Sequence, residues 1–313
     1  MDRLEAMAIL IATAEAGGFS AASRNLGIPL PTVSRKVGEL ENHLKARLFI
    51  RSTRKLVLTE AGASYLAACK RILEFVNEAE AEAAGEYNVP RGELTLSAPI
   101  VFGRLHVVPV VSDFLSEFLE INVRMMLSDR NVNLPEGHVD MAVRVGELPD
   151  SALVTTRVGS VRRVVCGSPA YFAKNGTPKT PDELTKHRCV TFSAMAVGGS
   201  WIFNPPGRKA RLVTPHCRLH INTAEAAIDA AIRGVGITNV LSYQIEAAVA
   251  EKKLKIVLQD FEPPPIPVNL LHAHQGPLPV KMRRFLEYAA PRIRQSVVTT
   301  QKKLGYGVDK QQT

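Results

Sequence analysis

Apolar side chains recur at helical spacing through the first part of the chain. Residues 3–16 carry one such stripe and predict a helix, which a pair of glycines ends. Ser20 is placed to cap a second, short helix, and Pro31 suits the first turn of a third helix that runs to Leu44. The apolar stripe of this third helix consists of Val33, Val37, Leu40 and Leu44. The pattern predicts a helix, a tight turn and a second amphipathic helix.

Polar and basic side chains at the start of the third helix, and in the loop after it, point to DNA. Residues 48–50 and 56–58 predict two short strands around a cationic loop. One helix fits the major groove, where Arg reads guanine, and a cationic wing contacts phosphates without reading sequence. The alternative is an ordinary amphipathic helix pair with a surface loop. The candidate DNA-binding residues are Ser20, Pro31, Thr32, Ser34, Arg35, Lys36, Arg51 and Arg54.

An ordered series of motifs runs through this region without a gap. It consists of Phe19-Ser20-Ala21-Ala22, Leu26, Pro31-Thr32-Val33-Ser34-Arg35, Leu40-Glu41, Leu48-Phe49, Arg51, Thr53-Arg54 and Leu58-Thr59-Glu60-Ala61-Gly62. This series resembles the N-terminal signature of LysR-type transcriptional regulators. The resemblance implies an all-α winged helix-turn-helix domain over residues 1–58, a linker and dimerisation helix over 59–88, and an effector-binding regulatory domain over 89–313. One departure is Gly38 within the third helix, where glycine costs about 1 kcal/mol relative to alanine.

Residues 59–87 predict one long helix, with Thr59 as its cap. Its apolar seam consists of Leu66, Cys69, Leu73 and Val76. Such a seam fits either a coiled coil or a single helix packed on its own domain. The resemblance implies that this helix pairs two chains, and that dimers join through the C-terminal body into tetramers. The segment 87–92 predicts the hinge that follows.

From residue 93 onward, strand-like and helix-like segments alternate, which predicts a parallel-sheet α/β fold. The resemblance implies two lobes of the periplasmic-binding-protein type, with lobe 1 at about 91–161 and 267–300 and lobe 2 at about 162–266. The proline run 263–267 suits the return crossover and argues against a central strand there.

Ligands of such folds bind at the carboxyl ends of strands and at helix N-termini. The candidate effector-binding residues at those ends are Ser97, Pro99, Ile100, Ser128, Asp129, Arg144, Gly146, Phe192, Ser193, Asn222 and Thr223. Several of them also fit simple helix caps. Arg144 stands in an otherwise apolar strand, so it either pairs with a carboxylate such as Asp129 or Glu147 or binds an anionic effector.

Charge supports anionic partners. The 313-residue chain has a net charge of +9, and the body from residue 89 onward retains +9 by itself. This excess favours promoter DNA and a small organic anion as partners, without identifying either. Further partners expected from the resemblance are a second copy of the chain and RNA polymerase. The longest apolar stretch near the N-terminus is far shorter than the roughly 18–20 residues of a membrane span, so a cytoplasmic location is expected.

Motifs for catalysis or cofactor binding are not evident. The sequence has no P-loop, no complete dinucleotide fingerprint and no nucleophile elbow, and its four cysteines form no CxxC pair. His216, Cys217 and His220 lie in an extended segment, where they are too far apart to chelate one metal ion. We therefore expect no enzyme, no metal and no cofactor other than a small-molecule co-inducer. The competing interpretation is a solute-binding or metabolic α/β protein with an unrelated helical N-terminus.

Overall fold

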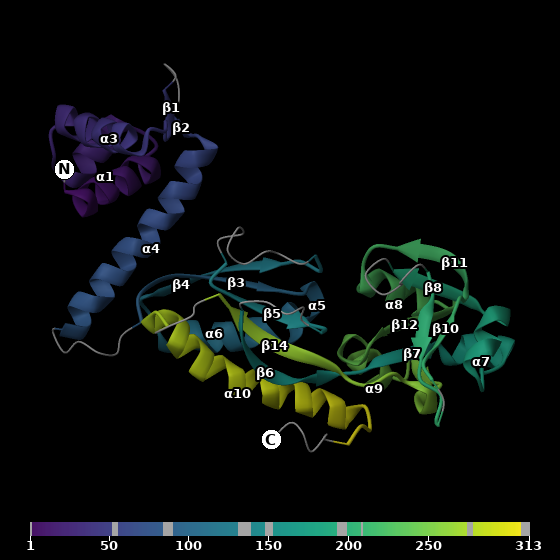
Figure 1. The fold of residues 1–313 in the computed structure, drawn as a ribbon. Helices are drawn as coiled ribbons and strands as arrows, with labels where there is room; N and C mark the ends of the chain where they lie inside the picture. Colours follow the sequence, from purple (N-terminus) through teal and green to yellow (C-terminus); the bar gives the residue numbers. More distant parts are fainter. Residues whose placement is uncertain are drawn as a thin grey trace. The chain divides into compact units, whose positions relative to one another are not determined.

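The computed structural model describes residues 2–51, 56–83, 90–130, 139–147, 153–192, 199–207, 209–273 and 278–307. The chain divides into two compact units, Met1–Val89 and Pro90–Thr313. Figure 1 shows the helical N-terminal unit in purple and blue and the α/β C-terminal unit in teal to yellow.

The N-terminal unit is a helical bundle with a two-stranded wing. Its elements are α1 (Arg3–Glu15), α2 (Phe19–Leu26), α3 (Leu30–Leu44), β1 (Phe49–Arg51), β2 (Leu56–Leu58) and α4 (Glu60–Ala83). The two strands pair antiparallel with Phe49 opposite Leu58. The apolar stripe predicted for the third helix supplies Val33, Val37 and Leu40 to the core, where all three are fully buried. The predicted winged helix-turn-helix architecture is confirmed.

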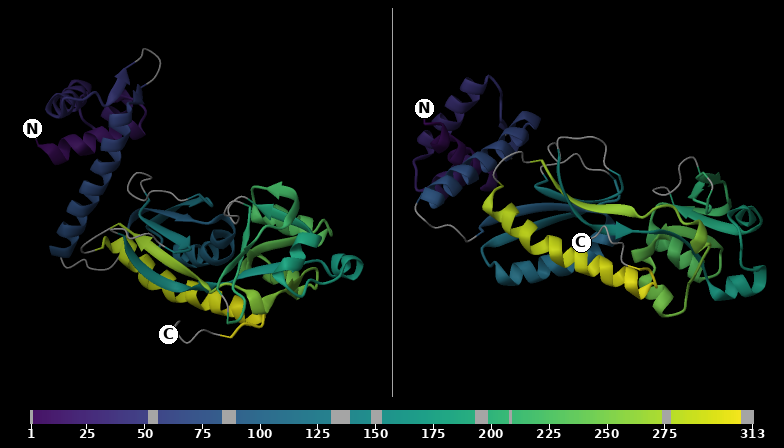
Figure 2. Two further views of the ribbon diagram at one scale, coloured as in Figure 1. Left: turned by 45° about the vertical axis from the view of Figure 1, so that its right-hand side comes forward. Right: turned by 60° about the horizontal axis from the view of Figure 1, so that its bottom comes forward.

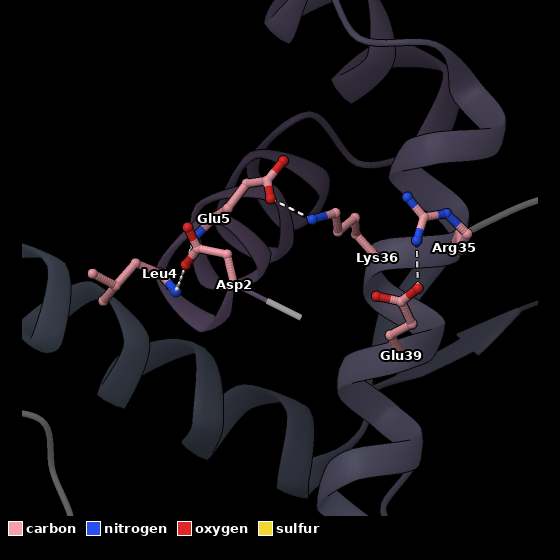
Figure 3. A network of polar contacts seen from close by, with 6 residues as sticks. All are labelled: Asp2, Leu4, Glu5, Arg35, Lys36 and Glu39. Carbon is pink, nitrogen blue, oxygen red and sulfur yellow. Dashed lines mark hydrogen bonds and ion pairs between the residues drawn. The ribbon is translucent and has the colours of Figure 1, made fainter.

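Caps set the boundaries of these helices, and one expected cap is wrong. Asp2 caps α1, because its carboxylate accepts the amide hydrogen of Leu4 at 2.9 Å (Figure 3). Thr59 caps α4, as expected, by accepting the amide hydrogen of Gly62 at 2.8 Å. Ser20 caps nothing: α2 begins one residue earlier, at Phe19, after an N-cap glycine that has no side chain to contribute.

The linker helix α4 buries most of its predicted seam within its own unit. Cys69 is fully buried in the core that α1, α2 and α3 share, and Leu66 and Leu73 pack against that core. The interpretation as a helix packed on its own domain therefore holds for these three positions. The larger apolar side chains that α4 leaves exposed are Ile72 and Phe75.

The C-terminal unit contains two five-stranded sheets, one in each lobe (Figure 2). The first has the order β4-β3-β5-β14-β6 and the second the order β11-β8-β12-β7-β13. The strands are β3 (Gly92–Ala98), β4 (Ile121–Leu127), β5 (Met141–Val145), β6 (Val154–Val161), β7 (Arg163–Gly167), β8 (Arg188–Phe192), β9 (Trp201–Phe203), β10 (Arg211–Val213), β11 (His216–Ile221), β12 (Ile237–Leu241), β13 (Lys255–Val257) and β14 (Ile266–His272). Strands β9 and β10 form a separate hairpin.

Helices cover these sheets. They are α5 (Ile100–Phe102), the π-helical turn η1 (Gly103–Val107), α6 (Val108–Glu117), α7 (Pro169–Asn175), η2 (Pro181–Lys186), α8 (Ala224–Ile232), η3 (Ser242–Gln244), α9 (Glu246–Ala250), η4 (Gln259–Phe261) and α10 (Val280–Lys303). The long α10 packs on β6 and α6 of the first lobe and reaches η3 and α9 of the second (Figures 1 and 2). One apolar core runs through both lobes.

Two expectations about the sheets are wrong. Both sheets are mixed rather than parallel, because β14 runs antiparallel to β5 and β6, and β12 and β13 run antiparallel to β7. Pro267 lies in β14, which occupies the interior of its sheet between β5 and β6. It stands next to the start of the strand and close to a register shift between Val268 and Asn269, and sheets admit Pro at strand starts and bulges. Its carbonyl still accepts the amide hydrogen of Gly146 at 3.0 Å.

The expected hinge over 87–92 begins outside the described residues, which resume at Pro90. No single helix in the described part of the chain is long and apolar enough to cross a membrane. Helices α1 and α2 are long and apolar enough only when taken together, and the chain bends by 118° between them.

Candidate functional site

The N-terminal half of α3 presents one cation openly to solvent. The side chain of Arg35 is 60% exposed and pairs with Glu39 one turn later, at 2.5 Å (Figure 3). An exposed pair of this kind contributes about 0–1 kcal/mol. Arg35 can therefore exchange Glu39 for another acceptor at low cost.

Lys36 is held differently from the sequence expectation. Its ammonium group forms an ion pair with Glu5 of α1, as Figure 3 shows, and its side chain is only 13% exposed. The contact ties the start of α3 to α1, so Lys36 does not project from an open polar face. No periodic signal indicated this, because Glu5 and Lys36 meet only when the two helices pack.

The remaining predicted DNA-binding residues differ in how exposed they are. Ser20 and Pro31 are exposed, and Thr32 and Ser34 are half-buried. Arg51 belongs to β1, but its side chain and the whole of Arg54 lie outside the described residues.

Glu41 belongs to the motif series of this unit, but the sequence assigned it no role. It is buried, and its carboxylate accepts the amide hydrogens of Leu48 at 2.8 Å and Phe49 at 3.2 Å. The carboxylate thereby holds the start of the wing to α3. A buried charge is retained only where hydrogen bonds replace its water, and these amides do so.

In the first lobe, hydrogen bonds join several predicted effector residues at the carboxyl ends of β3, β4 and β5. The Arg144 guanidinium donates to the Ser97 hydroxyl at 3.5 Å and to the Val143 carbonyl at 3.2 Å. Both Ser97 and Arg144 are buried, and burial lowers the pKa of Arg144. The pairing register places Asn269, also buried, opposite Arg144.

Asp129 lies at the helix N-terminus that begins with Ile100. Its carboxylate accepts the Ile100 amide hydrogen at 3.1 Å. Next to it, the Ser128 amide donates to the Ala98 carbonyl at 2.9 Å. A helix N-terminus favours negative charge, and here the protein itself supplies that charge. The expectation that this N-terminus draws an anionic ligand is weakened accordingly.

In the second lobe the predicted residues have unequal roles. Phe192 is a buried core residue at the end of β8, and Thr223 caps α8 by accepting the Ala226 amide hydrogen at 3.4 Å. Asn222 is exposed between β11 and α8. Ser193 lies outside the described residues.

A cluster that sequence analysis missed joins the lobes near Asp129. The rings of Phe102 and His106 from the first lobe pack against Tyr243 of the second, at 5.3 and 5.6 Å between centroids. Burial, and then the Asp129 carboxylate, raise the pKa of the Tyr243 hydroxyl. Burial also lowers the pKa of His106 to about 4, so this ring stays neutral at pH 7. The sequence could not predict this contact because Tyr243 lies far from Phe102 and His106 along the chain.

The described residues contain no group of three or more His, Cys, Asp or Glu side chains placed to hold a metal ion. What the arrangement offers chemically is recognition: an exposed arginine on a helix, and buried polar groups at strand ends.

Comparison with known proteins agrees with both halves of this description. Residues 4–63 match the family model of the bacterial regulatory helix-turn-helix proteins of the lysR family, and residues 88–294 match the LysR substrate binding domain. An HTH-type transcriptional regulator of Xanthomonas campestris pv. campestris is 34% identical over 288 residues, which cover 91% of this chain and 84% of that relative.

Solved structures extend the similarity to the whole fold. CrgA, a LysR-type transcriptional regulator from Neisseria meningitidis, is 28% identical, with a TM-score of 0.59 over 92% of this chain and 98% of that one. The Vibrio cholerae virulence activator AphB is 25% identical, with a TM-score of 0.59 over 91% and 98%. The chain has the helix-turn-helix unit, the two-lobed body and the sequence relationship together, and it belongs to the LysR family of transcriptional regulators.

Proposed function

We propose that α3 of this transcriptional regulator reads its operator through Ser34 and Arg35, while Arg51 and Arg54 of the wing contact phosphates. The observation that carries the proposal is the exposure of Arg35 at the N-terminal half of α3. Among the contacts described, Arg35 pairs only with Glu39 of the same helix, whose side chain is itself 36% exposed. Recognition helices of this motif contact bases with their N-terminal residues. A guanidinium reads guanine with two hydrogen bonds.

Replacing Arg35 tests this proposal. We expect Arg35→Ala to lose about 1–3 kcal/mol of affinity for the preferred operator and to discriminate less between operator variants. Arg24→Ala, which removes an equal charge from the exposed end of α2, is the matched control. It should weaken binding to all sequences alike, if at all. Equal effects of the two variants in gel shifts at fixed salt would assign Arg35 to phosphate contact and overturn its role as a base reader.

We further infer that a small organic anion is the effector and that Arg144 is its charge partner, at the strand ends between the lobes. Supporting this are the burial of Arg144 beside Ser97 and the net charge of +9 carried by the body alone. Guanidinium geometry suits a carboxylate. Pro99 and Gly146 follow the adjacent strands β3 and β5 of the first lobe, and Asn222 follows β11 of the second. A ligand that binds one lobe arrangement better than another shifts the population toward it, which is how such a site can regulate DNA binding.

A thermal-shift screen of small carboxylates tests the effector. A true ligand should stabilise the full chain by about 2.7 kcal/mol at a hundredfold excess over its Kd. That stabilisation should disappear in Arg144→Gln, while Arg124→Gln, on the exposed edge of β4, should keep it. Because Arg144 is buried, its replacement could disturb folding. A cooperative thermal transition of the unliganded Arg144→Gln variant is therefore required as evidence that it is folded. Ligands that are cations, or that stabilise Arg144→Gln equally, would contradict the charge argument.

We also propose that α4 pairs two chains through its exposed apolar side chains, Ile72 and Phe75, which are 38% and 42% exposed. Ile72→Asp would place an unpaired charge in that contact. Sedimentation of the full chain should show the oligomer dissociating in Ile72→Asp and persisting in Asn77→Asp, which adds an equal charge elsewhere on the helix. An unchanged oligomer in Ile72→Asp would exclude this face. From the family resemblance we also propose that dimers join into tetramers, that the protein contacts RNA polymerase and that it is located in the cytoplasm.

A further inference from the structure

Two cysteines face each other across neighbouring strands of the second lobe. Cys189 on β8 and Cys217 on β11 are direct partners in the parallel register of these strands, which are adjacent in Figure 1. Neighbouring strands lie about 4.8 Å apart. Disulfides join residues whose Cα atoms are about 4.4–6.8 Å apart, so the backbone spacing suits a bond between them.

Both side chains are on the same face of the sheet. Cys189 is fully buried in the cluster that contains Trp201 and Phe203, and Cys217 packs against that same cluster. The described thiols are free. The electrostatic influence of Cys217 on Cys189, which helps to raise the pKa of Cys189, agrees with their proximity.

The backbone around Cys217 has room to adjust. Directly aligned side chains in a sheet sit slightly farther apart than the roughly 3.8 Å between Cβ atoms of a disulfide. Strand β11 is the outermost strand of its sheet, and its register shifts between Cys217 and Leu219. An edge strand with a bulge beside the cysteine can approach β8 without disturbing a strand on its other side.

We propose that Cys189 and Cys217 are a redox pair that a hydroperoxide converts to an intrachain disulfide. Cys217 is the entry point because it is partly exposed, whereas Cys189 is not. The Cys217 sulfur attacks the hydroperoxide, the O–O bond breaks, an alcohol or water leaves, and Cys217 becomes a sulfenic acid. The Cys189 sulfur then attacks Cys217, the S–O bond breaks, and water leaves with the Cys189 proton. Two thiols are oxidised and one hydroperoxide is reduced.

The other two cysteines provide internal controls. Cys166 lies on β7, two strands away from β8, and belongs to the core on the opposite face of the sheet. Cys69 lies in the N-terminal unit. Both are fully buried and neither has a cysteine as register partner.

Burial raises the pKa of Cys217 and Cys189, so the thiolate is scarce at neutral pH and oxidation should accelerate as the pH rises.

The disulfide also bears on regulation. Strand β11 continues directly into Asn222 and Thr223, two of the proposed effector residues. A covalent link that draws β11 toward β8 therefore alters the strand that positions them. This consequence rests on the proposed function, whereas formation of the disulfide does not.

Peptide mapping of the oxidised full chain tests the pair. The native protein is treated with cumene hydroperoxide at pH 8, alkylated, digested and analysed by mass spectrometry. We expect two of the four thiols to be lost, one linked peptide pair joining Cys189 to Cys217, and full reversal by dithiothreitol. Cys69 and Cys166 should remain alkylated as free thiols.

Two variants separate the steps. In Cys189→Ala, which keeps a small apolar side chain in the core, Cys217 should gain oxygen instead of forming a disulfide. In Cys217→Ser, Cys189 should stay reduced. The proposal is overturned if wild-type thiols all stay reduced, if Cys217 is oxidised only to sulfinic acid, or if Cys217 links only to a second chain. The experiment uses neither DNA nor effector, so its failure would leave the regulatory function intact.

Discussion

Gly62→Ala is expected to destabilise the N-terminal unit by more than about 3 kcal/mol and to weaken DNA binding. A Cβ atom at this position would lie 2.0 Å from the carbonyl oxygen of Leu48 and 2.8 Å from its carbonyl carbon. These are backbone atoms, and the same oxygen accepts the Thr59 amide hydrogen at the wing-to-α4 junction. The neighbour therefore cannot move aside as a side chain would. Overpacking usually costs about 1–3 kcal/mol, and a clash with backbone should exceed about 3 kcal/mol.

Gly38→Ala is the matched control for Gly62→Ala. A Cβ atom at Gly38 meets nothing within 4 Å, and the residue lies within α3. The same substitution should therefore stabilise the unit by about 1 kcal/mol through helix propensity. Urea denaturation followed by circular dichroism measures both effects. If Gly62→Ala were as stable as wild type, the close approach of α4 to the wing would be wrong. A loss of DNA affinity in a stabilised Gly38→Ala would instead indicate that the backbone of α3 approaches DNA there.

The second large effect is an acid destabilisation of the C-terminal unit through His106. This ring is 3% exposed, shares a 2.8 Å hydrogen bond with Ser296, and has its pKa lowered by burial from 6.5 to about 4. The unfolded chain takes up a proton near pH 6.5, whereas the folded chain does so only near pH 4. Lowering the pH through this window therefore favours the unfolded state, by about 3 kcal/mol in total. Above pH 6.5 the group has no effect on the pH dependence.

His106→Gln separates this effect from that of the carboxylates, because glutamine can still hydrogen-bond to Ser296 but does not titrate. Fluorescence of Trp201, the single tryptophan of the chain, reports the unfolding of this unit. Between pH 7 and pH 4, wild type should lose about 3 kcal/mol of unfolding free energy relative to His106→Gln. A difference that stays constant over this range would show that His106 takes up its proton at the same pH in the folded and the unfolded protein.

Local sequence patterns were sufficient for the elements of the N-terminal unit. The stripe of Val33, Val37 and Leu40 predicts the buried face of α3, and the strands around the basic loop form the expected wing. Such patterns work because periodicity, turns and caps depend on residues close together in sequence. The error at Ser20 has a local cause as well: α2 begins at Phe19 after an N-cap glycine two residues before Ser20, so Ser20 already lies inside the helix.

The seam of α4 illustrates where local pattern stops. Its spacing fitted a coiled coil and a packed helix equally, and only the position of α1 decided that Cys69 belongs to the core of its own unit. Likewise, the proline rule for strands could not foresee that β14 enters the middle of a sheet at Pro267. Strand order is set by contacts between distant segments, which a linear pattern does not contain.

Sequence patterns alone indicate a two-part protein, with a helix-turn-helix, a basic wing and a mildly basic α/β body, and its motifs resemble those of LysR-type regulators. Which polar groups are available for binding depends on how the folded chain packs. The tertiary structure ties Lys36 to Glu5, places Asp129 on the helix N-terminus at Ile100, and brings Cys189 opposite Cys217. The physical reason is that burial and pairing of a side chain depend on partners distant in sequence, and folding alone brings those partners together.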